Sequence, residues 1–312
     1  MERKAALPAV LFLGFVFLSG LHVYSRSPTD PGEKIKVFVS ILPQAYFVGR
    51  VGGERVDVSV MVGPGQSPAT YEPVPKQMTR LSEARLYFCI GVPFEKIWAG
   101  RISKANPRMK AVDTRHGIEL MPMKAHHYRC EDKRAHHRHG EHEGDHDHSK
   151  GLKDPHIWLS LRLVKIQAQN ICDALIAADP AHRAYYQNNL RAFHSDLDKV
   201  DAEITEILEG LKTRKFMAFH PAWGYFARDY GLEQIPIEVE GKEPSARALA
   251  DLIRYAKQEG IKVVFVQAQF STKNAETVTR AIGGRILRID PLAGDYLKNM
   301  KKIAETFKKV IQ

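Results

Sequence analysis

The stretch IKVFVSILPQAYFVGRVGGERVDVSVMV, residues 35–62, decides the fold class of this chain. Its first part, Ile35–Ile41, is an apolar run that predicts a β-strand. Gln44–Val51 then has the pattern of a short helix that ends at Gly52-Gly53, and Arg55–Val62 has a valine at every second position, the period of another strand. A strand, a helix and a strand in succession predict a parallel sheet with helices on its faces.

The same alternation continues to Asp113 and restarts at Lys215. Further strands are predicted over Leu86–Ile90, Met109–Asp113, Lys215–Phe219, Glu233–Val239, Ile261–Val266 and Arg285–Ile289. Further helices are predicted over Val74–Ala84, Phe94–Ala105, Ala222–Tyr230, Ser245–Gln258, Thr272–Ile282 and Tyr296–Ile311. We therefore expect an α/β protein with two lobes, each a mainly parallel sheet flanked by helices.

Two helices without an intervening strand are predicted between the lobes. The first covers Leu161–Ala178 and ends at Asp179-Pro180. The second is a helix of about 45 Å that carries one apolar stripe, at alternating spacings of four and three residues. The stripe consists of Tyr186, Leu190, Phe193, Leu197, Val200, Ile204, Ile207 and Leu211. This pattern favours a long rigid helix that joins the two lobes, with a short coiled coil as the alternative.

The N-terminus has the pattern of a secretory signal. Charged residues at positions 2–4 precede an apolar run over Leu7–Leu21, and small residues follow at Val23 and Ser25. No cysteine follows the run, so the attachment pattern of bacterial lipoproteins is absent, and we expect a periplasmic protein whose mature chain starts near Arg26. An uncleaved anchor helix is the alternative, although the run is short for a membrane span.

Histidines gather in a polar tract in the middle of the chain. Eight of the fourteen histidines lie between residues 126 and 148, interleaved with aspartates and glutamates. The tract has no apolar period and predicts a mobile loop, and imidazole suits Zn²⁺, Cu²⁺ and Ni²⁺. We expect auxiliary metal binding by His126, His127, His136, His137, His139, His142, His146 and His148, with a solvated polar linker as the alternative.

These patterns divide the chain into four segments. They are a signal peptide at 1–25, an N-terminal lobe at 30–160 with the histidine-rich loop at 126–150, a helical connection at 161–211, and a C-terminal lobe at 212–312. Hydrophobic residues make up 44% of the chain, enough for a core in each lobe.

Charge and cysteine content limit the possible binding partners and the possible disulfides of the chain. The net charge is +10, but the basic residues are spread along the chain without an aromatic–basic motif, so we expect no nucleic-acid binding. An odd number of cysteines in an exported protein leaves at least one thiol unpaired. Cys89 and Cys172 lie in apolar runs and are expected to be buried, whereas Cys130 lies in the tract, either as a soft ligand or as a spectator.

Three candidate metal ligands are expected at strand ends, on both lobes. His156 follows the turn Asp154-Pro155 and precedes the apolar Ile157–Leu159, His220 follows a strand directly, and Asp290 follows another. Ligands of open α/β sheets bind beyond the carboxyl ends of strands. Two imidazoles and a carboxylate suit Zn²⁺, with Mn²⁺ or Fe²⁺ as alternatives. Each residue alone also fits a capping or hydrogen-bonding role.

Six motifs are spread along the chain, namely GPGQSPATYEP at 63–73, IGVPFE at 90–95, DPHIWL at 154–159, FHPAWGYF at 219–226, EGKEPS at 240–245 and DPL at 290–292. With these motifs the chain resembles, over nearly all of residues 34–312, the zinc/manganese-binding receptors of bacterial ABC uptake systems, the A-I cluster of solute-binding proteins. The family also often has a histidine-rich loop just before the Asp-Pro-His motif.

The resemblance implies two lobes joined by a long rigid helix, one metal ion in the cleft, and delivery to a membrane permease. His156, His220 and Asp290 match three of the four ligand positions of the family. It thus implies a receptor for Zn²⁺, with Mn²⁺ as the alternative, that is not an enzyme, and we expect it to be a monomer.

One position departs from the family pattern. The first ligand of the family is a histidine in the Gly-Pro-Gly loop, and this chain has Ala69 there, which cannot bind a metal. The fourth position then falls to water, to a neighbour such as Glu72, or to a histidine of the tract. Its loop keeps its glycines and prolines, so we expect its backbone still to direct position 69 toward the cleft.

Two other classes of protein compete with the receptor. Three protein ligands with a water also describe a catalytic zinc site, so a secreted zinc-dependent hydrolase is the first alternative. A His-Glu-x-x-His pattern occurs once, at His142–His146, but it lies in the polar tract, which lacks the apolar period of the helix that this motif requires. A histidine-rich metal storage or chaperone protein is the second alternative, and it would leave the two lobes unexplained.

Overall fold

The computed structural model describes residues 33–123, 153–238, 241–267, 269 and 273–311. The predicted signal peptide, the histidine tract and Cys130 lie outside the described residues. From Lys34 onward the chain forms one compact unit, which holds both predicted lobes. None of the helices within the described ranges is long and apolar enough to span a membrane.

The first sheet is parallel throughout and has the strand order β2-β1-β3-β4. Its strands are β1 (Ile35–Ile41), β2 (Val56–Val62), β3 (Leu86–Cys89) and β4 (Lys110–Asp113). The consecutive residues Val37, Phe38 and Val39 are all buried, although neighbouring side chains of a strand point to opposite faces. Both faces of the central strand are therefore covered, as a parallel sheet requires.

The second sheet repeats this topology, with the order β6-β5-β7-β8 and parallel strands throughout. Its strands are β5 (Lys215–Ala218), β6 (Glu233–Pro236), β7 (Val263–Val266) and β8 (Arg285–Arg288). The strand order reverses once in each sheet, between the neighbouring strands β1 and β3 of the first sheet and between β5 and β7 of the second. Such switch points leave a crevice at the carboxyl ends of the two strands, where ligands bind.

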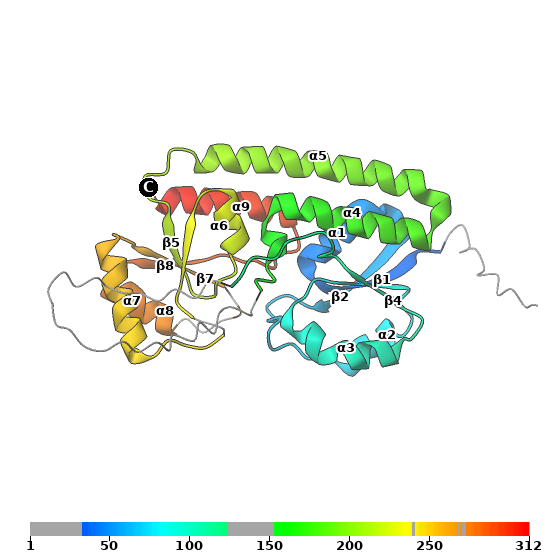
Figure 1. Cartoon of the computed structure of the whole chain (residues 1–312), viewed down its shortest axis with the longest axis horizontal. Helices are drawn as coiled ribbons and strands as arrows, with labels where there is room; N and C mark the ends of the chain where they lie inside the picture. Colours follow the sequence, from blue (N-terminus) through cyan, green and yellow to red (C-terminus); the bar gives the residue numbers. More distant parts are fainter. Residues whose placement is uncertain (1–32, 124–152, 239–240, 268, 270–272, 312) are drawn as a thin grey trace, which may run out of the picture. The chain divides into compact units, whose positions relative to one another are not determined.

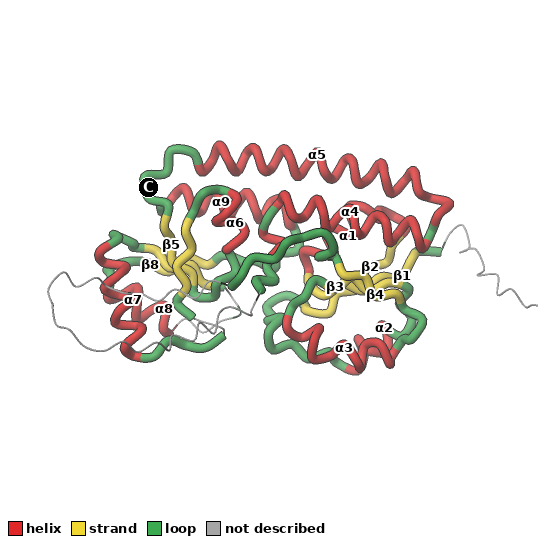
Figure 2. Tube along the Cα trace, viewed as in Figure 1, coloured by secondary structure: helices red, strands yellow, loops and turns green. Residues whose placement is uncertain are grey.

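Helices cover both faces of each sheet (Figure 1). On the first sheet, α1, α4 and α5 lie on one side and α2 and α3 on the other (Figure 2). On the second sheet, α6 and α9 lie on the side of α5, opposite α7 and α8. The bounds are α1 Leu42–Gly52, α2 Pro75–Leu81, α3 Pro93–Ala105, α4 Leu161–Ala178, α5 Arg183–Leu208, α6 Gly224–Asp229, α7 Ala246–Gln258, α8 Lys273–Ala281 and α9 Tyr296–Val310.

The long helix α5 joins the two lobes, as the apolar stripe predicts. Its 26 residues span about 39 Å. The helix packs on α1 and α4 of the first lobe and on α9 of the second. Five of the eight predicted stripe residues are fully buried, namely Tyr186, Leu190, Phe193, Leu197 and Ile204, and the other three are half-buried against the same core.

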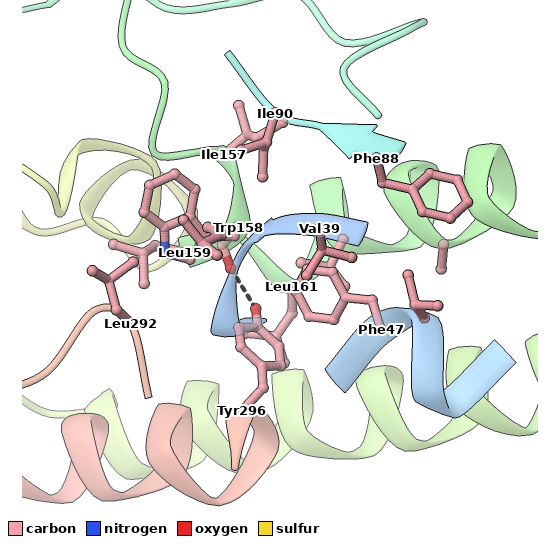
Figure 3. Packing of buried hydrophobic residues seen from close by; sticks show 14 of the residues in the cluster. Val39, Phe47, Phe88, Ile90, Ile157, Trp158, Leu159, Leu161, Leu292 and Tyr296 are labelled. Atoms are coloured by element: carbon pink, nitrogen blue, oxygen red, sulfur yellow. Dashed lines mark hydrogen bonds between the residues drawn. The ribbon is translucent and has the colours of Figure 1, made fainter. Parts of the chain in front are cut away.

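One hydrophobic core passes from the first sheet to the second, and Figure 3 shows where it crosses. Trp158 lies beside Leu292, and both of its polar groups are tied to the second lobe. Its indole Nε1 donates to the carbonyl of Pro291 at 2.7 Å, and its own carbonyl accepts from the Tyr296 hydroxyl at 2.7 Å. The crossing therefore fixes the segment that begins at His156 against the start of α9.

The predicted ends of elements are less accurate than the elements themselves. Several strands and helices are one to three residues shorter than predicted, and three short 3-10 turns at Gly53–Arg55, Ile157–Leu159 and Pro180–His182 have no counterpart in the prediction. Cys172 is buried as expected, whereas Cys89 is half-buried, and both thiols are free. The segment boundaries given from the sequence remain predictions.

A buried carboxylate fixes the turn between α4 and α5. Asp179 is 5% exposed and accepts hydrogen bonds from Arg55, His182 and the buried Tyr186 hydroxyl at 2.8–3.1 Å. Burial by itself opposes ionisation of Asp179, but these hydrogen bonds outweigh burial and lower its pKa. The carboxylate therefore stabilises the fold above the ordinary aspartate pKa, and this contribution is lost as the pH falls through the lower value of the folded state.

Asp179→Ala should lower the free energy of unfolding by about 3 kcal/mol at pH 7, because it leaves Arg55 and Tyr186 without their buried acceptor. The difference from the parent should shrink below about pH 4. Urea unfolding across this pH range is the measurement. Asp196→Ala is the control, since its half-exposed pair with Arg50 should contribute less than about 1 kcal/mol. Equal losses in the two variants would contradict the structural role of Asp179.

Candidate metal centre

A cavity of about 90 Å³ lies between the carboxyl-end loops of both sheets. The first lobe contributes the loop after β2 and the residues just before α3, and the second lobe contributes the loops after β5, β7 and β8. The lining residues are Ser67, Pro68, Ala69, Val92, Pro93, Met123, Pro155, His156, Trp158, His220, Gln269, Pro291 and Leu292. Two imidazoles are thus set in a largely apolar wall.

His156 is oriented by Asp154, two residues earlier. The Asp154 Oδ1 atom accepts from the backbone N–H of His156 at 2.9 Å and from its Nδ1 at 2.7 Å. A carboxylate only accepts hydrogen bonds, so Nδ1 carries the hydrogen and Nε2 has the lone pair. A Cβ at Gly224 would lie 2.8 Å from Asp154 Oδ2, so glycine at the start of α6 leaves room for this carboxylate.

The surroundings of His156 correct one expectation from the sequence. His156 does not follow a strand; it precedes the 3-10 turn Ile157–Leu159, whose three residues are buried as expected. Pro155 has no N–H with which to extend a ladder of strand hydrogen bonds, so strand pairing does not continue from the Pro122–Lys153 bridge through this position.

His220 is oriented in the same way from the second lobe. It lies just beyond β5, and its Nδ1 donates to Glu238, a 4% exposed carboxylate just beyond the neighbouring strand β6. The side chain of Gln267 donates to the backbone carbonyl of His220 at 3.1 Å. Hydrogen bonds therefore hold both the ring and the backbone of His220.

The two imidazoles face each other. Nε2 of His156 lies 3.2 Å from Nε2 of His220. Two nitrogen ligands of a tetrahedral Zn²⁺ with bonds of 2.0–2.1 Å lie about 3.3 Å apart. Since both Nδ1 atoms carry hydrogens toward carboxylates, two lone pairs converge here, and either a proton or a metal cation has to lie between them.

The charges behind the two rings suit a divalent cation. Asp154 and Glu238 are both buried, and each pairs with one imidazole. A metal-binding histidine commonly donates its other ring nitrogen to a carboxylate, which fixes the tautomer and increases the basicity of the ligand. The two negative charges of Asp154 and Glu238 together balance the charge of one Zn²⁺.

Glu238→Gln should reduce both the basicity and the metal affinity of His220. Burial lowers the pKa of this imidazole, and the hydrogen bond to Glu238 partly opposes that shift. Removing the carboxylate charge should therefore lower the pKa further and weaken zinc binding about 10- to 100-fold. NMR titration of the metal-free chain gives the pKa, and calorimetry gives the affinity. An unchanged or higher pKa in Glu238→Gln would contradict this account.

The loop from Gly63 to Pro73 directs Ala69 to the cavity wall, as expected. Its turn is closed by backbone hydrogen bonds from Gln66 to Gly63 and from Thr70 to Ser67. The N–H of Phe94 donates to the Pro68 carbonyl at 3.2 Å, which anchors the loop to α3. Glu72, considered above as a substitute ligand, is exposed and is not among the described residues that line the cavity.

Asp290 lies apart from the two histidines. Its Oδ1 accepts from the backbone N–H of Leu292 at 2.9 Å, and it lines a separate hollow with Arg288 and Asn299. Within the described ranges, no three His, Cys, Asp or Glu side chains are close enough together to hold a metal ion. The structure thus brings His156 and His220 together but not Asp290, and the ligand set of three remains a prediction.

The residues that flank the histidine tract lie next to the cavity. Pro122 and Lys153 form an isolated antiparallel bridge, and the N–H of Asp154 donates to the Met121 carbonyl at 2.8 Å. Met123 itself lines the cavity. The eight auxiliary histidines lie outside the described residues. The described residues on either side of the tract both lie beside the candidate site.

The sequence prediction missed the orienting carboxylates and one glutamine of the wall. Asp154 was visible in the Asp-Pro-His motif but was not given a role. Glu238 and Gln269 follow two strands of the second sheet, so the rule that ligands bind beyond strand ends could have found them. Their proximity to His220 depends on which strands are neighbours, which the sequence alone did not state.

Comparison with known proteins gives a family match along most of the chain. Residues 37–310 match the family described as "ZnuA: Zinc-uptake complex component A periplasmic". The zinc-binding protein AdcA of Streptococcus pyogenes serotype M3 is 30% identical over 293 residues, which cover 88% of this chain and 56% of that protein. The chain therefore spans little more than half the length of this streptococcal relative.

A second curated relative and two solved structures are similar over more of their length. The high-affinity zinc uptake system protein ZnuA of Bacillus subtilis strain 168 is 30% identical over 272 residues, covering 86% of this chain and 82% of that protein. A crystal structure of ZnuA superposes with a TM-score of 0.80 and 41% identity over 90% of this chain and 100% of that one. The structure of a ZnuA deletion mutant with zinc bound superposes with a TM-score of 0.79 and 41% identity, and the match covers 90% of this chain and 99% of that one.

Proposed function

This chain belongs to the ZnuA family of periplasmic zinc-uptake components, and we propose that it is the metal-binding receptor of an ABC importer. In this proposal it captures Zn²⁺ between its lobes, through His156, His220 and Asp290, and delivers the ion to a membrane permease. The observation that carries the proposal is the pair of facing imidazoles, each oriented by a buried carboxylate. Zinc is the cargo of such a receptor, and the protein performs no reaction on it.

The donor set favours zinc over manganese. Imidazole nitrogen suits Zn²⁺, whereas the harder Mn²⁺ prefers oxygen ligands. The two nitrogen donors that converge in the cavity therefore support Zn²⁺ as the main cargo. The largely apolar wall of the cavity also strengthens the interaction of a cation with these donors, since it excludes water.

Location and partners follow from the same role. We propose that the signal at 1–25 directs the chain to the periplasm, where it acts as a monomer with the permease as its partner and without nucleic acid. The lobes at 30–160 and 212–312 would form the cleft, with the connection at 161–211 between them. The histidines of the tract would supply additional, weaker metal sites beside it.

Deleting the histidine tract should leave one tight zinc site per chain. Residues 126–148 would be replaced by a short Gly-Ser turn, which can connect the two sides because Pro122 and Lys153 are already bridged. Calorimetric titration with Zn²⁺ should show one tight site and several weaker ones in the full chain, and only the tight one in the deletion variant. In competition, Zn²⁺ should bind more tightly than Mn²⁺.

The same titration separates the receptor from its competitors. Loss of all zinc binding on deletion would indicate a storage protein whose metal is held by the tract. Retention of one site together with turnover of an ester or peptide substrate would indicate a hydrolase. Tighter binding of Mn²⁺ than of Zn²⁺ would overturn the assignment of the cargo.

A further inference from the structure

Gln269 carries an amide oxygen for which the fold gives no explanation. The residue lines the same cavity as His156 and His220. Its Oε1 atom is shielded from solvent and has no hydrogen-bond partner among the described residues. Proteins nearly always satisfy a buried carbonyl oxygen, because leaving it without a donor destabilises the fold. An unsatisfied oxygen in the wall of a ligand cavity therefore indicates a partner that arrives with the ligand.

Gln269 and His220 follow neighbouring strands of the second sheet. Gln269 follows β7 and His220 follows β5, and these two strands flank the switch point of the second sheet. Both residues thus lie where an open α/β sheet binds its ligand. Gln267, on the same loop, already holds the backbone of His220 and does not line the cavity, so the two glutamines have different tasks.

The other oxygen donors nearby are less well placed. Asp290 is held by the backbone of Leu292 and lines another hollow. Glu72 is exposed and is not one of the described lining residues. Ala69 lines the cavity but has no donor atom. Among the described residues that line the cavity, Gln269 is therefore the one whose side-chain oxygen is buried and has no hydrogen-bond donor beside it.

We propose that the amide oxygen of Gln269 binds the metal as a further protein donor beside the proposed ligands His156, His220 and Asp290, in compensation for the ligand that Ala69 lacks. This proposal rests on the proposed function. An amide oxygen is neutral, so it adds a ligand without disturbing the match between two buried carboxylates and one divalent cation. A metal at this point would also satisfy the oxygen that the metal-free fold leaves without a partner.

The test compares Gln269→Leu with a matched control in the full chain. Gln167 is fully buried in α4, and neither atom of its amide has a partner among the described residues, so Gln167→Leu removes a comparable group away from the cavity. Calorimetry with Zn²⁺ should show that Gln269→Leu weakens the tightest site about 10- to 100-fold, whereas Gln167→Leu leaves it unchanged.

Thermal unfolding gives a second readout that a structural role would not reproduce. In the metal-free chain, Gln269→Leu should unfold at the same temperature as the parent or at a higher one, because an unsatisfied polar group has been removed. The increase in unfolding temperature on adding Zn²⁺ should be smaller in Gln269→Leu than in the parent and in Gln167→Leu. A marked drop in the metal-free unfolding temperature would assign Gln269 to structure instead.

A rescue variant completes the test. Gln269→Glu keeps an oxygen donor, so its zinc affinity should match or exceed that of the parent, and its affinity for Mn²⁺ should rise relative to zinc. The proposal is overturned if Gln269→Leu binds zinc as tightly as the parent, or if Gln269→Glu is as weak as Gln269→Leu. If the parent itself has no tight site, the proposed function fails, which is a different result.

Discussion

Zinc should bind the Ala69→His variant at least about 10- to 100-fold more tightly than the parent chain. Loss of a residue that merely orients a ligand typically costs this factor, and restoring a direct ligand should be worth no less. Ala69 lines the cavity that holds His156 and His220, so an imidazole at this position lies in the same wall as the other two. The loop is fixed by its own turn and by the bond from Phe94 to Pro68, so little ordering is needed.

The measurement is calorimetry on the tract-deleted chain, with Thr70→His as the control. Thr70 is the next residue of the loop, is exposed and is not among the described residues of the cavity wall, so its histidine adds an imidazole without adding a ligand. Imidazole suits Zn²⁺ better than a water or the neutral amide oxygen of Gln269, so Ala69→His should displace whichever of these donors compensates for the missing ligand. Equal affinities of parent and Ala69→His would mean that the existing donor already binds zinc as well as an imidazole at this position would.

His220→Ala should abolish tight zinc binding, with a loss of at least about 100-fold. The substitution removes one of two converging nitrogens and leaves Glu238 buried without its partner. His156→Ala should have a comparable effect, because each ring pairs with a buried carboxylate through Nδ1 and faces the other ring through Nε2. No single histidine of the tract should approach this loss.

His194→Ala is the matched control for His220→Ala. His194 is also partly buried, and burial likewise lowers its pKa, but it bonds to the Lys165 carbonyl on α4 and does not line the cavity. Zinc affinity in His194→Ala should equal that of the parent. Circular dichroism should first establish that each variant is folded, and a folded His220→Ala chain with parental affinity would remove the cavity from consideration as the zinc site.

The fold and half of the site could be predicted because both depend on local patterns. The strand period of Arg55–Val62 and the stripe on α5 are properties of short segments, and they gave the sheets and the joining helix correctly. His156 and His220 could be singled out because each lies at a boundary between a polar segment and an apolar run, and their role as metal ligands remains a prediction. The position of Ala69 followed from the turn residues around it.

The rest of the site depends on which segments become neighbours in space. Glu238 orients His220 because β6 pairs with β5, and Gln269 reaches the cavity because β7 pairs with β5 on the other side. Asp290 follows a strand as predicted, yet the backbone of Leu292 holds its carboxylate elsewhere. A sequence pattern shows that a residue is at a strand end, but not how its side chain is satisfied there.

The continuous core beneath the candidate site limits how fast a bound metal ion can leave it. Swinging the lobes apart would expose Trp158 and Tyr296, each of which buries about 150–250 Å² of surface when packed. It would also break the two hydrogen bonds that join Trp158 to Pro291 and Tyr296 of the second lobe. At about 25 cal/mol per Å², exposing one such ring costs about 5 kcal/mol, so a widely opened form should make up less than about one molecule in a thousand. Zinc should therefore leave through small local movements, and its spontaneous release should be slow compared with release in contact with a protein that stabilises the opened form.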